Sequence, residues 1–145
     1  SGRKCEIIKI CRQFLENLGV KIKSQVIKIG SKPVKAGDFK APDFDNLIEK
    51  SPLRIFDSSR ERELMDYIDQ VRDGCDTLGG VFELFIEGLV PGLGSYISWD
   101  KKLDGLLAQA LISIQAIKGL EFGLCFKYTE KLGSEAHDPI SYEAE

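Results

Sequence analysis

The sequence predicts an α+β fold, because two kinds of apolar pattern occur along its 145 residues. Apolar side chains at the spacing of one helix face lie in residues 3–18, 58–74 and 101–113. Shorter apolar or alternating segments, typical of strands, lie at residues 20–29, 81–87 and 118–122. At this length we expect a single domain, residues 1–145, with a buried core.

The first predicted helix, residues 3–18, has one apolar stripe that should be buried. The stripe consists of Ile7, Ile8, Cys11, Phe14, Leu15 and Leu18. Gly19 stands where a helix usually stops, since glycine adopts left-handed backbone angles at low cost. The strand expected next, residues 20–29, alternates imperfectly between apolar residues and lysines.

Residues 30–57 are the least regular part of the sequence. Glycine and proline interrupt every pattern there, at Gly30, Pro33, Gly37, Pro42 and Pro52. This predicts a long irregular loop region with at most one short helix, residues 44–50.

The second long helix is expected to begin at Ser58, which has the capping-box spacing to Glu61, and to end at Gly74. Its predicted buried stripe consists of Leu64, Met65, Ile68 and Val71. The strand that follows, residues 81–87, is nearly all apolar, which predicts that both of its faces are covered.

The third helix, residues 101–113, has the clearest apolar face. Its members are Leu103, Leu106, Leu107, Ala110, Leu111 and Ile114. Gly105 lies inside this helix at a cost of about 1 kcal/mol relative to alanine, which suggests a close contact at that position. After a short strand at 118–122, the polar residues 134–145 are expected to form a mobile tail.

Composition and charge argue against several classes of protein. The net charge of −3 and a pI near 5.3 do not suit a nucleic-acid binder. The sequence contains no apolar stretch of membrane-spanning length and no signal peptide, so we expect a cytoplasmic protein with no membrane partner. Four cysteines match no zinc or redox spacing and are expected to be reduced and buried. They are Cys5, Cys11, Cys75 and Cys125.

Few residues suggest chemistry by themselves. The glycine-rich loop at residues 91–94 can bring a ligand close to backbone amides, although such loops are often simple turns. His137 has no partners at the spacing of a metal or nucleophile motif. Four carboxylates form two pairs that are close in sequence, with helix-end and surface roles as the alternative. They are Asp73, Asp76, Asp100 and Asp104. We therefore expect no metal site.

Six segments, in this order, resemble motifs of the chorismate synthase family. They are SGR at 1–3, DTLGG at 76–80, GLGSY at 92–96, LDGLLAQALISIQAIKG at 103–119, EFG at 121–123 and GSEAHDPI at 133–140. The resemblance extends over almost the whole chain and is most specific over residues 76–123.

This resemblance implies both a fold and a reaction. Members of the family convert 5-enolpyruvylshikimate 3-phosphate to chorismate by a 1,4-elimination of phosphate that requires reduced FMN. The implied fold is a segment of a four-layer β/α/α/β sandwich, with antiparallel sheets and packed helices, in a homotetramer. The family is also associated with NADP, and whether a separate partner or an intrinsic reductase reduces the flavin stays open.

The resemblance also implies roles for four residues. Ser1 is expected near the flavin, Arg3 near the substrate, and Gln115 with Ala116 in contact with FMN. The family's catalytic histidines belong to motifs that this sequence does not contain, and His137 matches neither of them. The implied site therefore binds cofactor and substrate and has no catalytic residue.

Two hypotheses of different classes follow. In one, the chain is the central part of a chorismate synthase and is inactive by itself. In the other, it is a non-catalytic remnant or interaction module that retains the packing core of the family.

Overall fold

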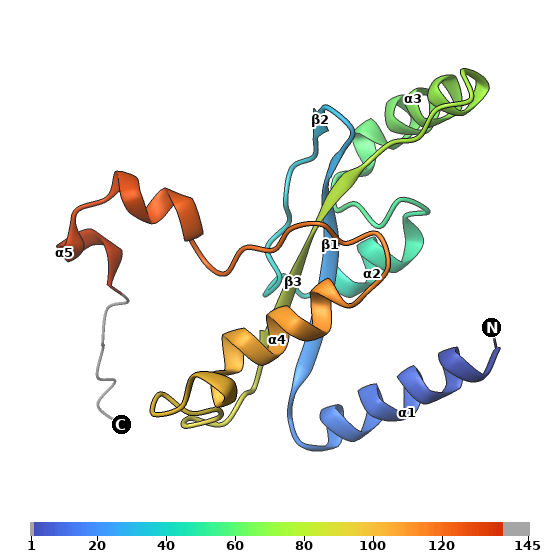
Figure 1. Cartoon of the computed structure of the whole chain (residues 1–145). Coiled ribbons are helices and arrows are strands. Elements are labelled where there is room, and N and C mark those ends of the chain that lie inside the picture. Colours follow the sequence, from blue (N-terminus) through green and yellow to red (C-terminus); the bar gives the residue numbers. More distant parts are fainter. Residues whose placement is uncertain (1, 138–145) are drawn as a thin grey trace. The chain divides into compact units, whose positions relative to one another are not determined.

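The computed structural model describes residues 2–137, and residues 2–8 by their backbone alone. The chain forms two compact units, one ending at Leu89 and the other beginning at Val90. The first unit contains α1 (Gly2–Asn17), β1 (Lys21–Ile29), β2 (Lys32–Pro33), α2 (Phe44–Lys50), η1 (Ser58–Arg60), α3 (Glu61–Asp73) and β3 (Gly80–Glu87) (Figure 1). The second contains η2 (Trp99–Lys101), α4 (Leu103–Ile112), η3 (Cys125–Glu130) and α5 (Gly133–Ala136).

An antiparallel sheet with the strand order β2-β1-β3 organises the first unit (Figure 1). Lys21 lies opposite Glu87, an arrangement of unlike charges that favours this register. The register shifts between Val26 and Lys28, and at this irregularity the Val26 N–H donates to the Arg54 carbonyl at 2.9 Å. The segment before α3 is thereby attached to the middle of β1.

The hydrophobic core of this unit joins β1 to α3. Its buried members are Val34, Ile55 and Leu64, against which Val26, Ile29 and Leu53 pack. An aromatic group adds to this packing, with the Phe39 ring stacked on Phe85 at 4.8 Å between centroids. Phe44 of α2 contacts the Phe39 ring at 4.9 Å, so the irregular segment packs its aromatic side chains onto the sheet.

Gln25 fixes the irregular segment to the sheet through a buried polar contact. Its side chain is 1% exposed and exchanges two hydrogen bonds with the backbone of Gly37, Nε2 donating to the carbonyl at 3.1 Å and Oε1 accepting from the N–H at 2.9 Å. Nε2 also donates to the Glu83 carboxylate at 3.0 Å. Pairing of this kind avoids the cost of burying an unsatisfied amide.

The ends of α1 and the position of α2 agree with the sequence predictions. At Gly19, φ is +81°, its N–H donates to the Glu16 carbonyl, and the Val20 N–H donates to the Leu15 carbonyl. These two bonds make a Schellman motif, which confirms Gly19 as the helix stop. The predicted helix at 44–50 is confirmed as α2.

Burial was predicted wrongly for several members of the α1 stripe and for two of the cysteines, while the side chains of Cys5, Ile7 and Ile8 lie outside those that the structure describes. Leu15 of this stripe is half-buried, but Phe14 is 63% exposed and Leu18 is 60% exposed. Cys11 and Cys75 are also exposed, whereas Cys125 is half-buried; these three thiols are free.

The predicted capping box at Ser58 is wrong. Asp57 caps the η1 turn by accepting a hydrogen bond from the Ser59 N–H at 3.0 Å, and α3 itself begins at Glu61 without a side-chain cap. The Glu61 carboxylate accepts from the Ser51 hydroxyl, so it is engaged away from Ser58. Of the predicted α3 stripe only Leu64 is fully buried.

Two strand predictions fail in different ways. β3 forms where expected, but Val81, Phe82 and Leu84 are 47%, 44% and 38% exposed, because the described residues leave much of its surface uncovered. Residues 118–122 are not a strand, since no hydrogen-bonded partner strand lies beside them within residues 2–137.

The helix of the second unit is shorter than predicted. Residues 99–101 form a 3₁₀ turn and α4 begins at Leu103. The apolar face of α4 is at most half-buried, and a Cβ placed on Gly105 would meet only the Trp99 carbonyl oxygen, at 3.9 Å. The close contact expected at Gly105 is therefore absent among the described residues. Residues 133–136 form α5 with Ala136 buried, while the rest of the expected tail, from residue 138, lies outside the described residues.

Candidate functional site

The residues implied by the family resemblance divide between the two units. Ser1 lies outside the described residues, and Arg3 is part of α1, where the backbone alone is described. Gln115 and Ala116 lie together in the second unit, in the turn that follows α4. Within the second unit the structure places Gln115 and Ala116 in one turn.

The turn after α4 has a defined hydrogen-bonding geometry. The Ile117 N–H donates to the Ile114 carbonyl at 3.2 Å, which makes Gln115 and Ala116 its two central residues. Ala116 has a φ of +73°, the backbone angle that position i+2 of a type II turn requires and that glycine usually supplies. The Ser113 hydroxyl donates to the Ala110 carbonyl at 2.6 Å and completes the end of α4.

Both central side chains of this turn are exposed. The Gln115 amide offers one acceptor and two donor positions, so it can hydrogen-bond the polar edge of a heteroaromatic ring. A left-handed alanine costs roughly 1–2 kcal/mol of conformational energy relative to an ordinary backbone. Arg54, Cys75 and Cys125 also have a positive φ among the described residues, so this strain by itself does not identify a ligand contact.

The glycine-rich loop before α4 surrounds a pocket of about 600 Å³. The lining residues are Gly92, Leu93, Gly94, Ser95, Tyr96, Ile97, Lys102, Leu103 and Asp104. Gly94 has a φ of +85°, and a Cβ there would lie 3.0 Å from the Leu103 Cβ, so this approach of loop to helix requires glycine. The Ser95 N–H donates to the Lys101 carbonyl at 3.0 Å and closes the loop against η2.

The lining of this pocket is mostly apolar and contains two charged groups. Its charged groups are Lys102 and Asp104, which pair at 3.8 Å, and the Asp104 Oδ1 accepts from the Gly105 N–H at 2.8 Å. Tyr96, Ile97 and Trp99, in and beside the loop, are 95%, 83% and 87% exposed. The loop that the sequence singled out thus lines an open hollow, with exposed apolar side chains in and beside it.

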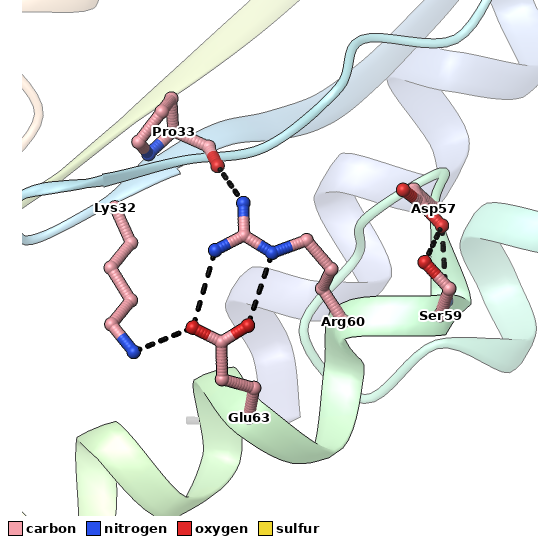
Figure 2. A network of polar contacts seen from close by, with 6 residues as sticks. All are labelled: Lys32, Pro33, Asp57, Ser59, Arg60 and Glu63. Atoms are coloured by element: carbon pink, nitrogen blue, oxygen red, sulfur yellow. Dashed lines mark hydrogen bonds and ion pairs between the residues drawn. The ribbon is translucent and has the colours of Figure 1, made fainter.

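A polar network in the first unit was not predicted from the sequence (Figure 2). The Arg60 guanidinium donates to both carboxylate oxygens of Glu63, at 3.1 and 3.2 Å, and to the Pro33 carbonyl at 2.9 Å. Lys32 Nζ donates to the same carboxylate at 2.7 Å and lies 4.9 Å from the Tyr67 ring centroid. The network joins β2 to α3 on the surface of the unit.

These contacts shift the pKa values of the side chains that make them. The hydrogen bonds from Arg60 and then from Lys32 lower the pKa of Glu63 to about 2. The hydrogen bond to Glu63 raises the pKa of Arg60, and the bonds from Ser59 lower the pKa of Asp57. In each case the hydrogen bond favours the charged form of the group, as expected for a structural ion pair. The i,i+3 spacing of Arg60 and Glu63 could have indicated their pairing, but Lys32 is too distant in sequence to be predicted.

The remaining titratable candidates have surface and helix-end roles. Asp76 accepts from the Thr77 N–H at 2.7 Å, and Asp73 pairs with Arg72 at 3.7 Å. Asp100 accepts from the Ser98 hydroxyl within the 3₁₀ turn. His137 is exposed at the end of α5. Among residues 9–137, whose side chains the structure describes, no three His, Cys, Asp or Glu side chains group as metal ligands.

None of the helices that the structure describes is long and apolar enough to cross a membrane.

Comparison with known proteins matches the chain to one family. The family profile described as Chorismate synthase matches residues 3–145. The chorismate synthase of Desulfitobacterium hafniense (strain Y51) is 42% identical over 144 residues, covering 99% of this chain and 37% of that protein. The chorismate synthase of Aquifex aeolicus (strain VF5) is 43% identical over 141 residues, covering 92% and 35%. The chain thus spans little more than a third of the length of these relatives.

A solved structure agrees with these sequence matches. The structure entitled "Crystal Structure of Chorismate Synthase" has a TM-score of 0.83 to this chain at 42% sequence identity, covering 92% of this chain and 42% of that one. The predicted α+β class and the resemblance drawn from the motifs are both confirmed.

Proposed function

Because the chain belongs to the chorismate synthase family, we propose that it supplies a cofactor-facing part of an enzyme that makes chorismate. The substrate is 5-enolpyruvylshikimate 3-phosphate, and the reaction is the 1,4-elimination of phosphate. The observation that carries this proposal is the match over residues 3–145 together with the TM-score of 0.83 to a solved chorismate synthase.

In this proposal the turn after α4 contacts reduced FMN. The cofactor supplies electron density to the reacting substrate without net oxidation or reduction. The exposed amide of Gln115 fits a hydrogen bond to the polar edge of the flavin, and the small side chain of Ala116 lets the ring approach the backbone of the turn. Ser1 is proposed to lie near the same flavin, and Arg3 to bind a phosphate or carboxylate of the substrate, for which guanidinium groups are well suited.

The chain by itself is expected to be inactive. General acid–base catalysis requires a positioned proton donor or acceptor, and the family's catalytic histidines belong to motifs that this sequence does not contain. Residues 1–145 should therefore release no phosphate from 5-enolpyruvylshikimate 3-phosphate in the presence of reduced FMN. Release above the rate without protein would show that the chain contains catalytic groups.

A segment exchange tests the proposed role directly. Residues 1–145 would replace the matching segment of the Desulfitobacterium hafniense enzyme, to which they are 42% identical. We expect the resulting chimera to release phosphate from the substrate when reduced FMN is present. A chimera with native-like circular dichroism and native oligomeric state but no activity would contradict the proposal.

The alternative function is that of a non-catalytic interaction module. The observation that favours it is the exposed apolar surface of Tyr96, Ile97 and Trp99. An inactive but folded chimera would support this alternative.

The other properties of the protein are also proposed from the family. We propose a homotetramer, a cytoplasmic location, an association with NADP, and no nucleic-acid or membrane partner. The net charge of −3 agrees with the absence of a nucleic-acid partner. Light scattering on the chimera would test the tetramer, and a dimer or monomer would contradict it.

A further inference from the structure

We draw no further inference here: the strongest candidate, the exposed apolar face of the β1–β3 pair that carries Phe82 and Leu84, carries no proposal because nothing among the described residues shows what covers it.

Discussion

Glu63 accepts hydrogen bonds from Arg60 through both of its carboxylate oxygens, while Lys32 donates to one of them. The second contact crosses from β2 to α3, so this carboxylate links two elements that are distant in sequence (Figure 2). Its consequences can be measured, because the contacts lower the pKa of Glu63 from 4.5 to about 2.

The first prediction concerns the pH dependence of stability. Since the folded state holds the pKa of Glu63 below its unfolded value, the ionised carboxylate stabilises the fold above about pH 4.5. This contribution should decline as the pH falls from 4.5 toward 2. The free energies of unfolding of the unaltered chain and of the Glu63→Gln variant, measured by denaturation, should therefore differ at pH 7 and converge near pH 2.

High salt and a control substitution make this prediction specific. Because the network is exposed, the difference at pH 7 should shrink in 1 M NaCl. Glu130→Gln, in η3, should show no such pH-dependent difference from the unaltered chain. A Glu63→Gln difference that is constant between pH 7 and pH 2 would contradict the proposed linkage.

The second prediction concerns the packing of Gly37. A Cβ at this position would lie 2.2 Å from the Phe56 ring, and moving the backbone would disturb both hydrogen bonds to Gln25. Overpacking and lost hydrogen bonds together should make Gly37→Ala destabilising by about 2–4 kcal/mol. Urea denaturation measures this change.

Gly105→Ala is the matched control for Gly37→Ala. Its Cβ would meet only the Trp99 carbonyl oxygen at 3.9 Å, and alanine is the better helix former. We expect stabilisation of up to about 1 kcal/mol. Equal changes in the free energy of unfolding for the two substitutions would show that close packing at Gly37 does not contribute to stability.

The third prediction concerns the left-handed backbone of Ala116. Glycine adopts a φ of +73° without the steric cost that alanine carries, although it loses more entropy on folding. Ala116→Gly should therefore stabilise the chain by about 0.5–1 kcal/mol, whereas Ala116→Val should destabilise it. Loss of stability in Ala116→Gly, measured by urea denaturation, would contradict the strain inferred for this turn.

Local sequence signals predicted the elements whose determinants lie within them. The end of α1 at Gly19 was predictable because the Schellman bonds that stop the helix involve only neighbouring residues. α2 has the predicted bounds because Pro42 and Pro52 flank a short segment whose buried apolar residues are Phe44 and Ile48. In both cases the signal and the structure involve the same few residues.

Predictions failed where partners distant in sequence decide the outcome. Glu61 has the spacing of a capping box to Ser58, but the Ser51 hydroxyl donates to it instead. Residues 118–122 have the composition of a strand, yet a strand forms only beside a hydrogen-bonded partner.

The candidate site was only partly predictable for a similar reason. Family motifs indicated Gln115 and Ala116, but no property of an alanine residue signals that its φ is +73°. Lys32 pairs with Glu63 across 31 positions, and no local pattern indicates such a contact.

The fourth prediction concerns residues 88–98, where the first compact unit ends and the second begins. These residues contain no helix or strand, and Tyr96 within them and Trp99 directly after them are almost fully exposed. Brief digestion with chymotrypsin should cut first after one of these two aromatic residues, because exposed irregular segments fit a protease active site. Mass spectrometry of the earliest fragments identifies the site of cleavage.

A control variant distinguishes the effect of exposure on cleavage from the preference of chymotrypsin for aromatic residues. In the double substitution Tyr96→Ser and Trp99→Ser, the first cleavage should be slower and should move elsewhere. Cleavage after Phe85 of β3 in the unaltered chain, as the earliest event, would contradict the proposed accessibility of residues 88–98.

The fifth prediction concerns the proposed contact of Gln115 with FMN, tested in the chimeric enzyme. Removing one hydrogen bond between uncharged groups costs about 1 kcal/mol, which corresponds to a roughly fivefold change in affinity. Gln115→Ala should therefore raise the Kd for FMN about fivefold in a fluorescence titration. Gln109→Ala, on the exposed side of α4, should leave the Kd unchanged. Equal affinities of Gln115→Ala and the unaltered chimera would remove Gln115 from the proposed site, even if the chimera remained an active lyase.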